Sequence, residues 1–158
     1  MEMSGIIVGV DGSRYSRRAL EWGMNEAAIR HVPITVVAVY QPAAGYWGSA
    51  VSYPDGRARA ERGRVERDRV ERARATARVA VGKALARLGD DHPVSVSVKA
   101  VSGNPGEEIL DAARDADMIV VGARGAGGFA RLLMGSVSTH LTYHARCPVV
   151  VIPSDDRG

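Results

Sequence analysis

The sequence predicts an α/β fold: a single-domain, Rossmann-like open sheet of five parallel strands with four helices. Two observations lead to this prediction. Five short apolar runs alternate along the 158-residue chain with four segments of helical character, and this alternation is typical of βαβ crossovers in a mainly parallel sheet. One run, Met118–Val121, contains no polar residue, as expected of a strand that is buried on both faces. The length suits one domain with a sizeable core, so we expect a single domain over residues 1–158.

The first three elements form one βαβ unit. A strand is predicted at Ile6–Val10, and Asp11 follows directly after it. Ser13 can cap the helix expected from about Ser16 to Arg30, because a serine hydroxyl accepts hydrogen bonds from the free amides of a first turn. The apolar run Ile34–Tyr40 is predicted to be the second strand.

The middle of the chain combines a loop with a long charged helix. Gln41–Gly56 is rich in Pro, Gly and Ser, and we hypothesise that it is a lid whose aromatic residues order over a ligand. The alternative is a loop that stays flexible or packs on a neighbouring subunit. A helix is predicted at Arg57–Leu88, with an apolar seam along it. The seam consists of Val65, Val70, Ala73, Ala77, Val81, Leu85 and Leu88.

The first part of this helix, Arg57–Arg78, holds nine arginines against three glutamates and one aspartate. We interpret it as a solvated amphipathic helix with weak ion pairs between neighbouring turns. The alternative is a surface for an anionic partner, including nucleic acid. No nucleic-acid-binding motif is recognisable, so nucleic acid is not the expected partner.

The last five elements follow the same alternation. Val94–Val101 is predicted as the third strand, and Pro105 fits the first turn of a helix that runs to about Arg114. Met118–Val121 is the fourth strand. A helix from Gly135 to about Tyr143 leads to the fifth strand, Pro148–Ile152.

A glycine-rich segment follows the fourth strand. It reads Gly122-Ala123-Arg124-Gly125, then nine residues, then Gly135-Ser136-Val137-Ser138. Glycine allows close approach of the backbone, and the free amides and dipole at a helix start attract an anion. Two such points a loop apart suit a polyphosphate better than a single phosphate.

The spacing G-x-x-G-x9-G-S resembles that of the ATP-binding branch of the universal stress protein family. Further segments match that family in order, namely Ile6–Ser13, Ser102–Pro105 and Cys147–Pro153, so the resemblance covers roughly Ile6 to Pro153. The resemblance implies strand order 3-2-1-4-5, with nucleotide at the switch point between strands one and four. Asp11 and Gly122 would then face each other across the crevice. We find no internal repeat, so we do not expect the tandem form of the family.

The resemblance implies a set of nucleotide-binding residues. Asp11 can accept from ribose hydroxyls or bind a cation, although an aspartate that caps the backbone amides of its own turn is an alternative. The backbone of Val39 would meet the adenine edge, and Gly103 would lie near the ligand. Family members often carry a basic residue at the position of Ala126. The alanine in this chain removes that possible partner for a phosphate. The candidate residues are Gly9, Asp11, Val39, Gly103, Gly122, Ala123, Arg124, Gly125, Ala126, Gly127, Gly128, Gly135, Ser136, Val137 and Ser138.

The expected function is regulatory. ATP is the predicted ligand, with ADP and AMP as alternatives and Mg²⁺ bridging the phosphates, and occupancy would change conformation, assembly or the choice of a regulatory protein partner. No P-loop motif, general base or metal-ligand set is recognisable, so we do not expect an enzyme. A slow ATP-hydrolysing enzyme is the alternative.

The fifth strand is a candidate dimer interface. Val149–Ile152 is predicted at a sheet edge and carries no charge, and a bare apolar edge invites pairing with a second copy. The family resemblance points to the same homodimer. The alternative is a monomer whose sheet edge is covered by the tail Ser154–Gly158.

Composition and isolated residues add smaller constraints. The chain is 46% hydrophobic and 25% charged, with a formal net charge of +3, as in an ordinary soluble globular protein. It shows no membrane-length apolar run and no signal peptide, so a cytoplasmic location is expected. Cys147 is interpreted as an inert core thiol. His140 and His144 have a spacing that can bind metal, but no third ligand is nearby in sequence, so no metal site is predicted.

Overall fold

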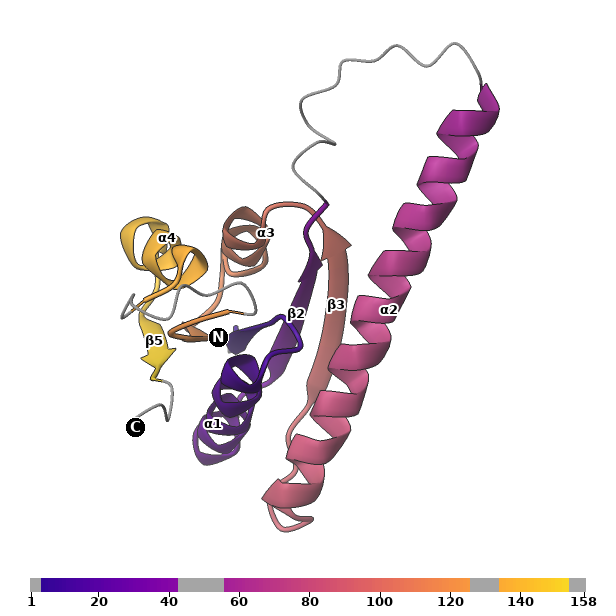
Figure 1. Cartoon of the computed structure of the whole chain (residues 1–158). Helices are drawn as coiled ribbons and strands as arrows, with labels where there is room; N and C mark the ends of the chain where they lie inside the picture. Colours follow the sequence, from indigo (N-terminus) through magenta and orange to yellow (C-terminus); the bar gives the residue numbers. More distant parts are fainter. Residues whose placement is uncertain (1–3, 43–55, 126–133, 154–158) are drawn as a thin grey trace, which may run out of the picture.

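Five parallel strands form the centre of the molecule (Figure 1). The computed structural model describes residues 4–42, 56–125 and 134–153. The strands are β1 (Ile6–Val10), β2 (Ile34–Tyr40), β3 (Val96–Ser102), β4 (Met118–Gly122) and β5 (Val149–Ile152). Their order in the sheet is β3-β2-β1-β4-β5, and every neighbouring pair is parallel. The predicted fold class and strand order are therefore confirmed.

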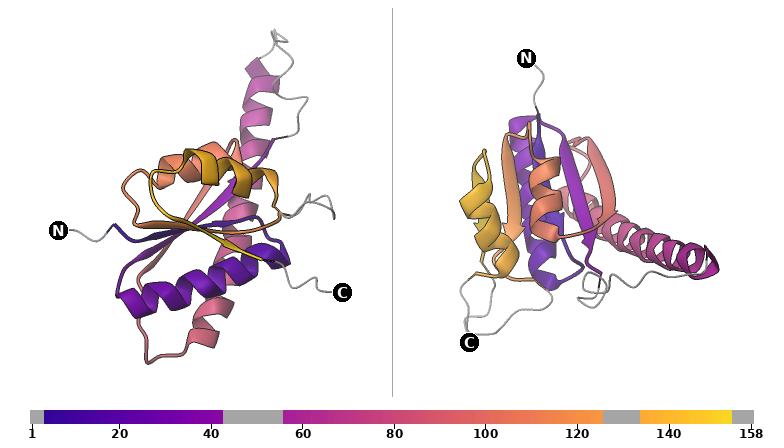
Figure 2. Two further views of the ribbon diagram at one scale, coloured as in Figure 1. Left: turned by 90° about the vertical axis from the view of Figure 1, so that its left-hand side faces the viewer. Right: turned by 90° about the horizontal axis from the view of Figure 1, so that it is seen from above.

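Four helices cover the two faces of the sheet. They are α1 (Arg14–Arg30), α2 (Gly56–Leu88), α3 (Pro105–Ala112) and α4 (Ser136–His144). Helices α1 and α2 contact each other on one face, and α3 and α4 contact each other on the opposite face (Figure 2). The sheet is thus a layer between a pair of long helices and a pair of short ones.

The side chains of the strands divide between two cores because successive residues of a strand point to opposite faces. On the α1–α2 side, Ile6 and Val8 of β1 are at most 1% exposed and pack with Leu20 of α1. On the α3–α4 side, Ile7 of β1 packs with Ile109 of α3 and other buried residues. Burial on both faces explains why the strands read as continuous apolar runs.

The helix ends follow local capping chemistry. Ser13 Oγ accepts a hydrogen bond from Ser16 N at 3.2 Å, which confirms the predicted cap, although the helix begins at Arg14 rather than Ser16. Asn104 caps α3 in the same way, accepting from Glu107 N at 3.2 Å. Helix α3 ends at Ala112, two residues earlier than predicted, and β3 begins two residues later than predicted.

The apolar seam predicted along α2 is wrong over part of its length. Only Ala77, Val81 and Ala84 are buried, whereas Val65 is 47% exposed and Leu85 is 37% exposed. The reason is that the N-terminal half of α2 projects beyond the sheet, as Figure 1 shows, so Val65 has no core to pack against. Arg69 Nη1 donates to the hydroxyl of Tyr40, at the end of β2, at 2.6 Å.

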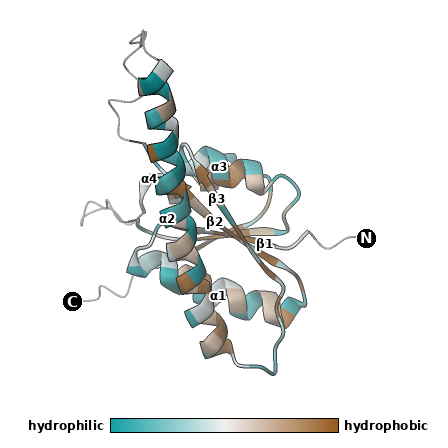
Figure 3. Cartoon of the chain, turned by 90° about the vertical axis from the view of Figure 1, so that its right-hand side faces the viewer, coloured by the Kyte–Doolittle hydropathy of each residue, from teal (hydrophilic) through white to brown (hydrophobic). Residues whose placement is uncertain are grey.

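The projecting part of α2 is stabilised by its own charges. Residues 61–75 repeat the pattern Glu-Arg-x-Arg-Val or Glu-Arg-x-Arg-Ala three times, so the expectation of no internal repeat is wrong at this short length. Each glutamate has an arginine four residues before it and another three residues after it. One of these pairs joins Arg74 Nε to Glu71 Oε1 at 3.2 Å. Pairs at these spacings support a helix that has little packing of its own. Figure 3 shows that hydrophilic segments predominate along the projecting part of α2, with a few hydrophobic ones among them.

The predicted lid, with Tyr46, Trp47 and Tyr53, falls at residues 43–55 and lies outside the described residues. Among the helices that the structure describes, none is both long enough and apolar enough to cross a bilayer.

Candidate functional site

The carboxyl ends of β1 and β4 meet where the strand order reverses. Strand β1 pairs with both β2 and β4, and the chain leaves β1 and β4 toward opposite faces of the sheet. Asp11 follows β1, and Gly122 is the last residue of β4. Ligands of open α/β sheets bind at this kind of switch point.

Asp11 and Gly125 are brought together at this point. A Cβ atom added to Gly125 would lie only 2.7 Å from Asp11 Oδ2. Gly122 instead abuts the start of α1, where an added Cβ atom would lie 3.0 Å from the carbonyl oxygen of Tyr15. The residue that faces Asp11 is therefore Gly125 rather than the expected Gly122, and only glycine fits there without displacing the carboxylate.

The Asp11 carboxylate also supports its own turn. Its Oδ1 accepts from Ser13 N at 2.9 Å, and the amide of Asp11 donates to Ser16 Oγ at 3.3 Å. The alternative role of a turn aspartate is thus present in the structure. The turn involves Oδ1, and Oδ2 lies beside Gly125.

The start of α4 lies against the same segment. Gly135 N donates to the carbonyl of Ala123, which holds the two halves of the glycine-rich motif side by side. The N-cap of α4 is Gly135, which offers no side-chain acceptor, and the first turn of α4 contains no acid. The positive end of this helix is therefore not neutralised by its own residues.

Two of the candidate residues, Ser138 and Gly9, have structural roles in the chain. Ser138 is 2% exposed, and its hydroxyl donates to the carbonyls of Ala123 and Gly135 at 3.0 and 3.1 Å. In this conformation the Ser138 hydroxyl is therefore engaged within the chain. At Gly9, an added Cβ atom would lie 2.6 Å from Ile109 Cδ1, so this glycine allows α3 to pack on the sheet.

Other candidate residues lie along the same edge of the sheet. Val39, near the end of β2, lines a cavity of about 350 Å³ together with Asp11. Gly103 follows β3 with a φ of 150°, and its amide donates to the Tyr40 carbonyl at 2.9 Å. Ser136 is exposed at the start of α4. Ala126, Gly127 and Gly128 lie outside the described residues.

Helix α2 forms a wall of this cavity that sequence reasoning missed. Its contribution comes from small residues at helical spacing, Ala73, Thr76, Ala77 and Ala80, and from Lys83, while α1 contributes Arg17. The recurrence of small side chains along one face of α2 is the sequence signal that could have indicated a hollow beneath this helix.

The isolated titratable residues behave as structural groups. His140 Nε2 lies 2.9 Å from Glu107 Oε1, an ion-pair distance whose angle is not that of a hydrogen bond. The rings of His140 and His144 are 4.4 Å apart. Among residues 4–42, 56–125 and 134–153, no three His, Cys, Asp or Glu side chains are grouped to hold a metal ion. Burial raises the pKa of the Cys147 thiol, which makes it less reactive at neutral pH.

The sequence as a whole decides the family. Residues 3–153 match the family model described as "Universal stress protein family". The chain belongs to the universal stress protein family. "Universal stress protein Rv2005c" of Mycobacterium tuberculosis is 38% identical over 152 residues, which are 96% of this chain and 48% of that protein. The chain thus spans about half the length of the curated relatives it matches.

Solved structures of universal stress proteins share the fold. UspA from Lactobacillus plantarum superimposes with a TM-score of 0.74 at 23% identity, covering 96% of this chain and 99% of that one. A universal stress protein in complex with cAMP gives a TM-score of 0.61 at 24% identity, with 94% of each chain covered. The protein from Archaeoglobus fulgidus in complex with dAMP gives 0.54 at 22% identity, covering 96% of this chain and 99% of that one.

Proposed function

We propose that this universal stress protein binds an adenine nucleotide between Asp11 and the start of α4. The observation that carries the proposal is the uncapped, acid-free start of α4, which lies against the glycine segment that faces Asp11. Two structural relatives contain cAMP and dAMP, and this supports an adenine nucleotide as the ligand class.

ATP is the specific ligand that we propose, with Mg²⁺ bridging its phosphates. The backbone amides of Ser136 and Val137 would receive the phosphates, because the start of a helix favours anions. Asp11 would accept from the ribose hydroxyls, and the backbone of Val39 would meet the adenine edge. ADP and AMP contain the same adenosine moiety and are the alternatives.

The role that we propose for the nucleotide is regulation without turnover. The sequence lacks the G-x-x-x-x-G-K-[ST] motif, and Asp11, the carboxylate of the site, is engaged with its own turn. Without a group that activates water, a bound γ-phosphoryl persists. We place this activity in the cytoplasm and in a single domain over residues 1–158.

A steric substitution tests the site. Gly125→Leu places a side chain where Asp11 Oδ2 lies, and we expect ATP affinity to fall by about 100-fold or more, equivalent to about 2.7 kcal/mol. The control is Gly82→Leu in α2, where an added Cβ atom meets nothing within 4 Å. Isothermal titration calorimetry measures both variants. Undiminished affinity in Gly125→Leu would exclude this site.

A separate measurement tests for turnover. Release of phosphate from ATP is followed in highly purified protein with Mg²⁺ present. Several turnovers per second, lost in the Gly125→Leu variant, would replace the regulatory proposal with the alternative of an ATP-hydrolysing enzyme.

A homodimer through β5 completes the proposal. All four residues of Val149–Ile152 are half-buried in the single chain, and β5 lies at the edge of the sheet beside β4. Two-fold pairing would cover both edges at once. Light scattering should give about twice the chain mass of 16.8 kDa, and Val150→Lys should reduce it to the monomer. A dimer that survives both Val150→Lys and Val151→Pro would rule out this interface.

A further inference from the structure

The charges of the chain are divided unevenly between its two helix layers. Helices α1 and α2 hold 15 of the 21 Lys and Arg residues but only six of the 18 Asp and Glu residues, a formal charge of +9. The rest of the chain therefore carries −6. The modest net charge of +3 conceals one strongly basic layer.

A groove runs between these two helices. Its volume is about 380 Å³, and its apolar lining includes Leu20 of α1 with Ala80 and Ala84 of α2. Four residues, Arg17, Leu20, Ala80 and Lys83, line both this groove and the neighbouring cavity at Asp11, so the two hollows adjoin. Small side chains on α2 leave this space open beside a buried leucine.

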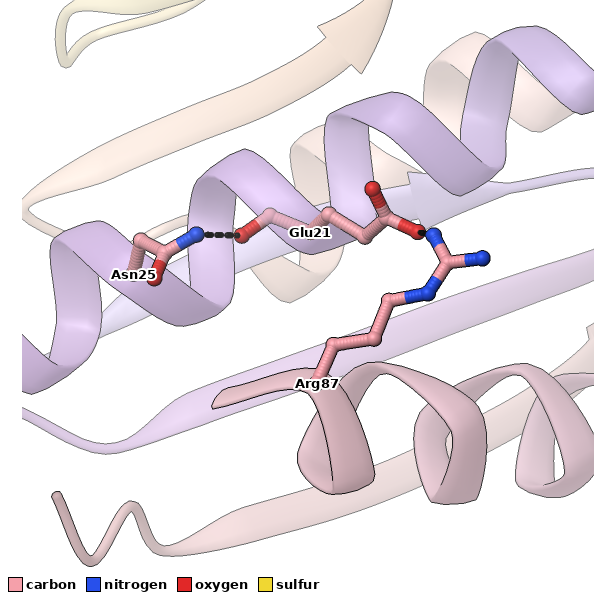
Figure 4. A network of polar contacts seen from close by, with 3 residues as sticks. All are labelled: Glu21, Asn25 and Arg87. Atoms are coloured by element: carbon pink, nitrogen blue, oxygen red, sulfur yellow. Dashed lines mark hydrogen bonds and ion pairs between the residues drawn. The ribbon is translucent and has the colours of Figure 1, made fainter. Parts of the chain in front are cut away.

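The rim of the groove is basic. Arg87 pairs with Glu21 across the two helices, and Glu21 also accepts from Asn25 through its backbone carbonyl (Figure 4). Among the described residues that line the groove, Glu21 is the only acid, and Arg87 compensates its charge. Arg18 Nη1 donates to the carbonyl of Pro153 at 2.6 Å.

Two cations of the rim remain available for a partner. Among the described residues, the side chains of Arg17 and Lys83 have no hydrogen-bond or ion-pair partner. Both residues are exposed, and they stand on the two opposite helices. An anion between them would contact both helices at once.

We propose that the groove between α1 and α2 binds an acidic amphipathic segment of a partner protein. Carboxylates of the segment pair with Arg17 and Lys83, and its apolar side chains enter the hollow above Leu20, Ala80 and Ala84. The combination of an apolar floor and a basic rim matches a peptide that carries both kinds of side chain.

The groove fits a peptide better than it fits a nucleic acid. Phosphate backbones are bound by arginines and lysines on open surfaces and do not need an apolar hollow. The arginine-rich projecting half of α2 also carries Glu61, Glu66 and Glu71, which repel phosphates at the same surface. The described lining of the groove contains no uncompensated acid.

Fluorescence anisotropy tests the proposal on the full chain without nucleotide, so its result is independent of the proposed nucleotide site. The probe is a fluorescein-labelled peptide of three Glu-Glu-Leu-Glu-Leu copies. Its controls are the same peptide with serine for leucine, a 20-base-pair DNA duplex, and vesicles of phosphatidylcholine with phosphatidylserine. We expect the leucine peptide to bind at least ten-fold more tightly than the serine peptide.

Matched charge reversals locate the binding surface. Arg17→Glu with Lys83→Glu should weaken peptide binding by at least ten-fold. Arg59→Glu with Arg64→Glu changes the net charge equally on the projecting part of α2 and should change binding by less than two-fold. If circular dichroism shows that the groove reversal is unfolded, Arg17→Gln with Lys83→Gln replaces it, with an expected loss of at least three-fold.

Three outcomes would overturn the proposal. Equal losses in the two reversals would mean that general charge attracts the peptide. Equal binding of the serine peptide would mean that the apolar floor is not used. Tighter binding of DNA or vesicles than of the leucine peptide would assign the basic layer to a different class of partner.

Discussion

Helices α3 and α4 lie on the same face of the sheet, but their N-terminal ends differ in chemistry. Helix α3 begins with Asn104 as a side-chain cap and has Glu107 and Glu108 in its first turn. Helix α4 begins with Gly135, which gives no side-chain cap, and has no acid in its first turn. The positive end of α3 is satisfied from within the chain, whereas α4 receives neither a side-chain cap nor an acid from its own residues, and this difference underlies the nucleotide site that we propose. The comparison teaches that the absence of a cap can carry functional information.

The largest expected effect comes from making α4 resemble α3. Ser136→Asp puts a carboxylate in the first turn of α4, where it competes with phosphate and repels it. We expect ATP affinity to fall by about 100-fold or more, while the helix dipole interaction raises the free energy of unfolding by about 0.3–1 kcal/mol. Calorimetry and urea denaturation measure the two changes. Ser136→Asn is the uncharged control, and equal loss in both variants would mean that charge at this position does not matter.

A smaller effect is expected when the packing of α3 on the sheet is disturbed, and this effect is on the free energy of unfolding. Gly9→Ala puts a methyl group 2.6 Å from Ile109 Cδ1, and overpacking of this kind lowers the free energy of unfolding by about 1–3 kcal/mol. Because Gly9 packs against α3 rather than Asp11, ATP affinity of the folded variant should stay within two-fold. Urea denaturation measures the stability, and calorimetry measures the ATP affinity. A large loss of ATP affinity without a loss of stability would show that Gly9 belongs to the binding site.

Removing the N-cap of α3 should lower the free energy of unfolding by less than the Gly9 substitution does. Asn104→Ala deletes the acceptor for Glu107 N, and loss of an N-cap lowers the free energy of unfolding by about 1 kcal/mol. Asn104→Asp keeps an acceptor and should restore most of the stability. Thermal and urea denaturation of the three proteins provide the comparison, and an alanine variant as stable as the parent would show that this cap contributes nothing.

The smallest effect on the free energy of unfolding is expected at the contact between α3 and α4. Glu107→Gln removes the charge beside His140 and also one acid from the first turn of α3. The glutamate side chain is 64% exposed, so solvent screens the pair, and the free energy of unfolding should fall by less than about 1 kcal/mol. Urea denaturation at low and high salt should show this difference shrinking as salt rises. A difference that is larger at high salt would contradict an electrostatic origin.

The strands of the sheet could be predicted from the sequence because each strand is encoded by residues that are neighbours in the chain. Each strand is an apolar run with turn residues beside it, and β1 and β4 are buried on both faces except at their last residues. The order of the strands came from the family resemblance rather than from the runs, since pairing depends on contacts between distant segments. The cap at Ser13 was equally readable, as its hydroxyl bonds only three residues away.

The parts of the site that sequence reasoning missed depend on long-range contacts. Ser138 has the same hydroxyl whether it faces a ligand or the carbonyl of Ala123, fifteen residues earlier. Gly9 is a glycine because Ile109 lies over it, a hundred residues away in the chain. The seam on α2 contained enough apolar residues to suggest a buried stripe, but the sequence does not state where the sheet beneath it ends.

The charged repeat in α2 makes the length of this helix independent of the rest of the molecule. Every five residues of the pattern add about 7.5 Å to a helix and rotate its end by about 140° about the helix axis. Each added copy brings its own glutamate and arginines. Copies could be inserted or deleted between residues 61 and 68 without repacking the cores, because none of these residues is buried and none packs against a buried cluster. The number of repeats therefore sets the length of the projecting part of α2. It also sets the distance from the sheet of any segment attached to the N-terminal end of this helix.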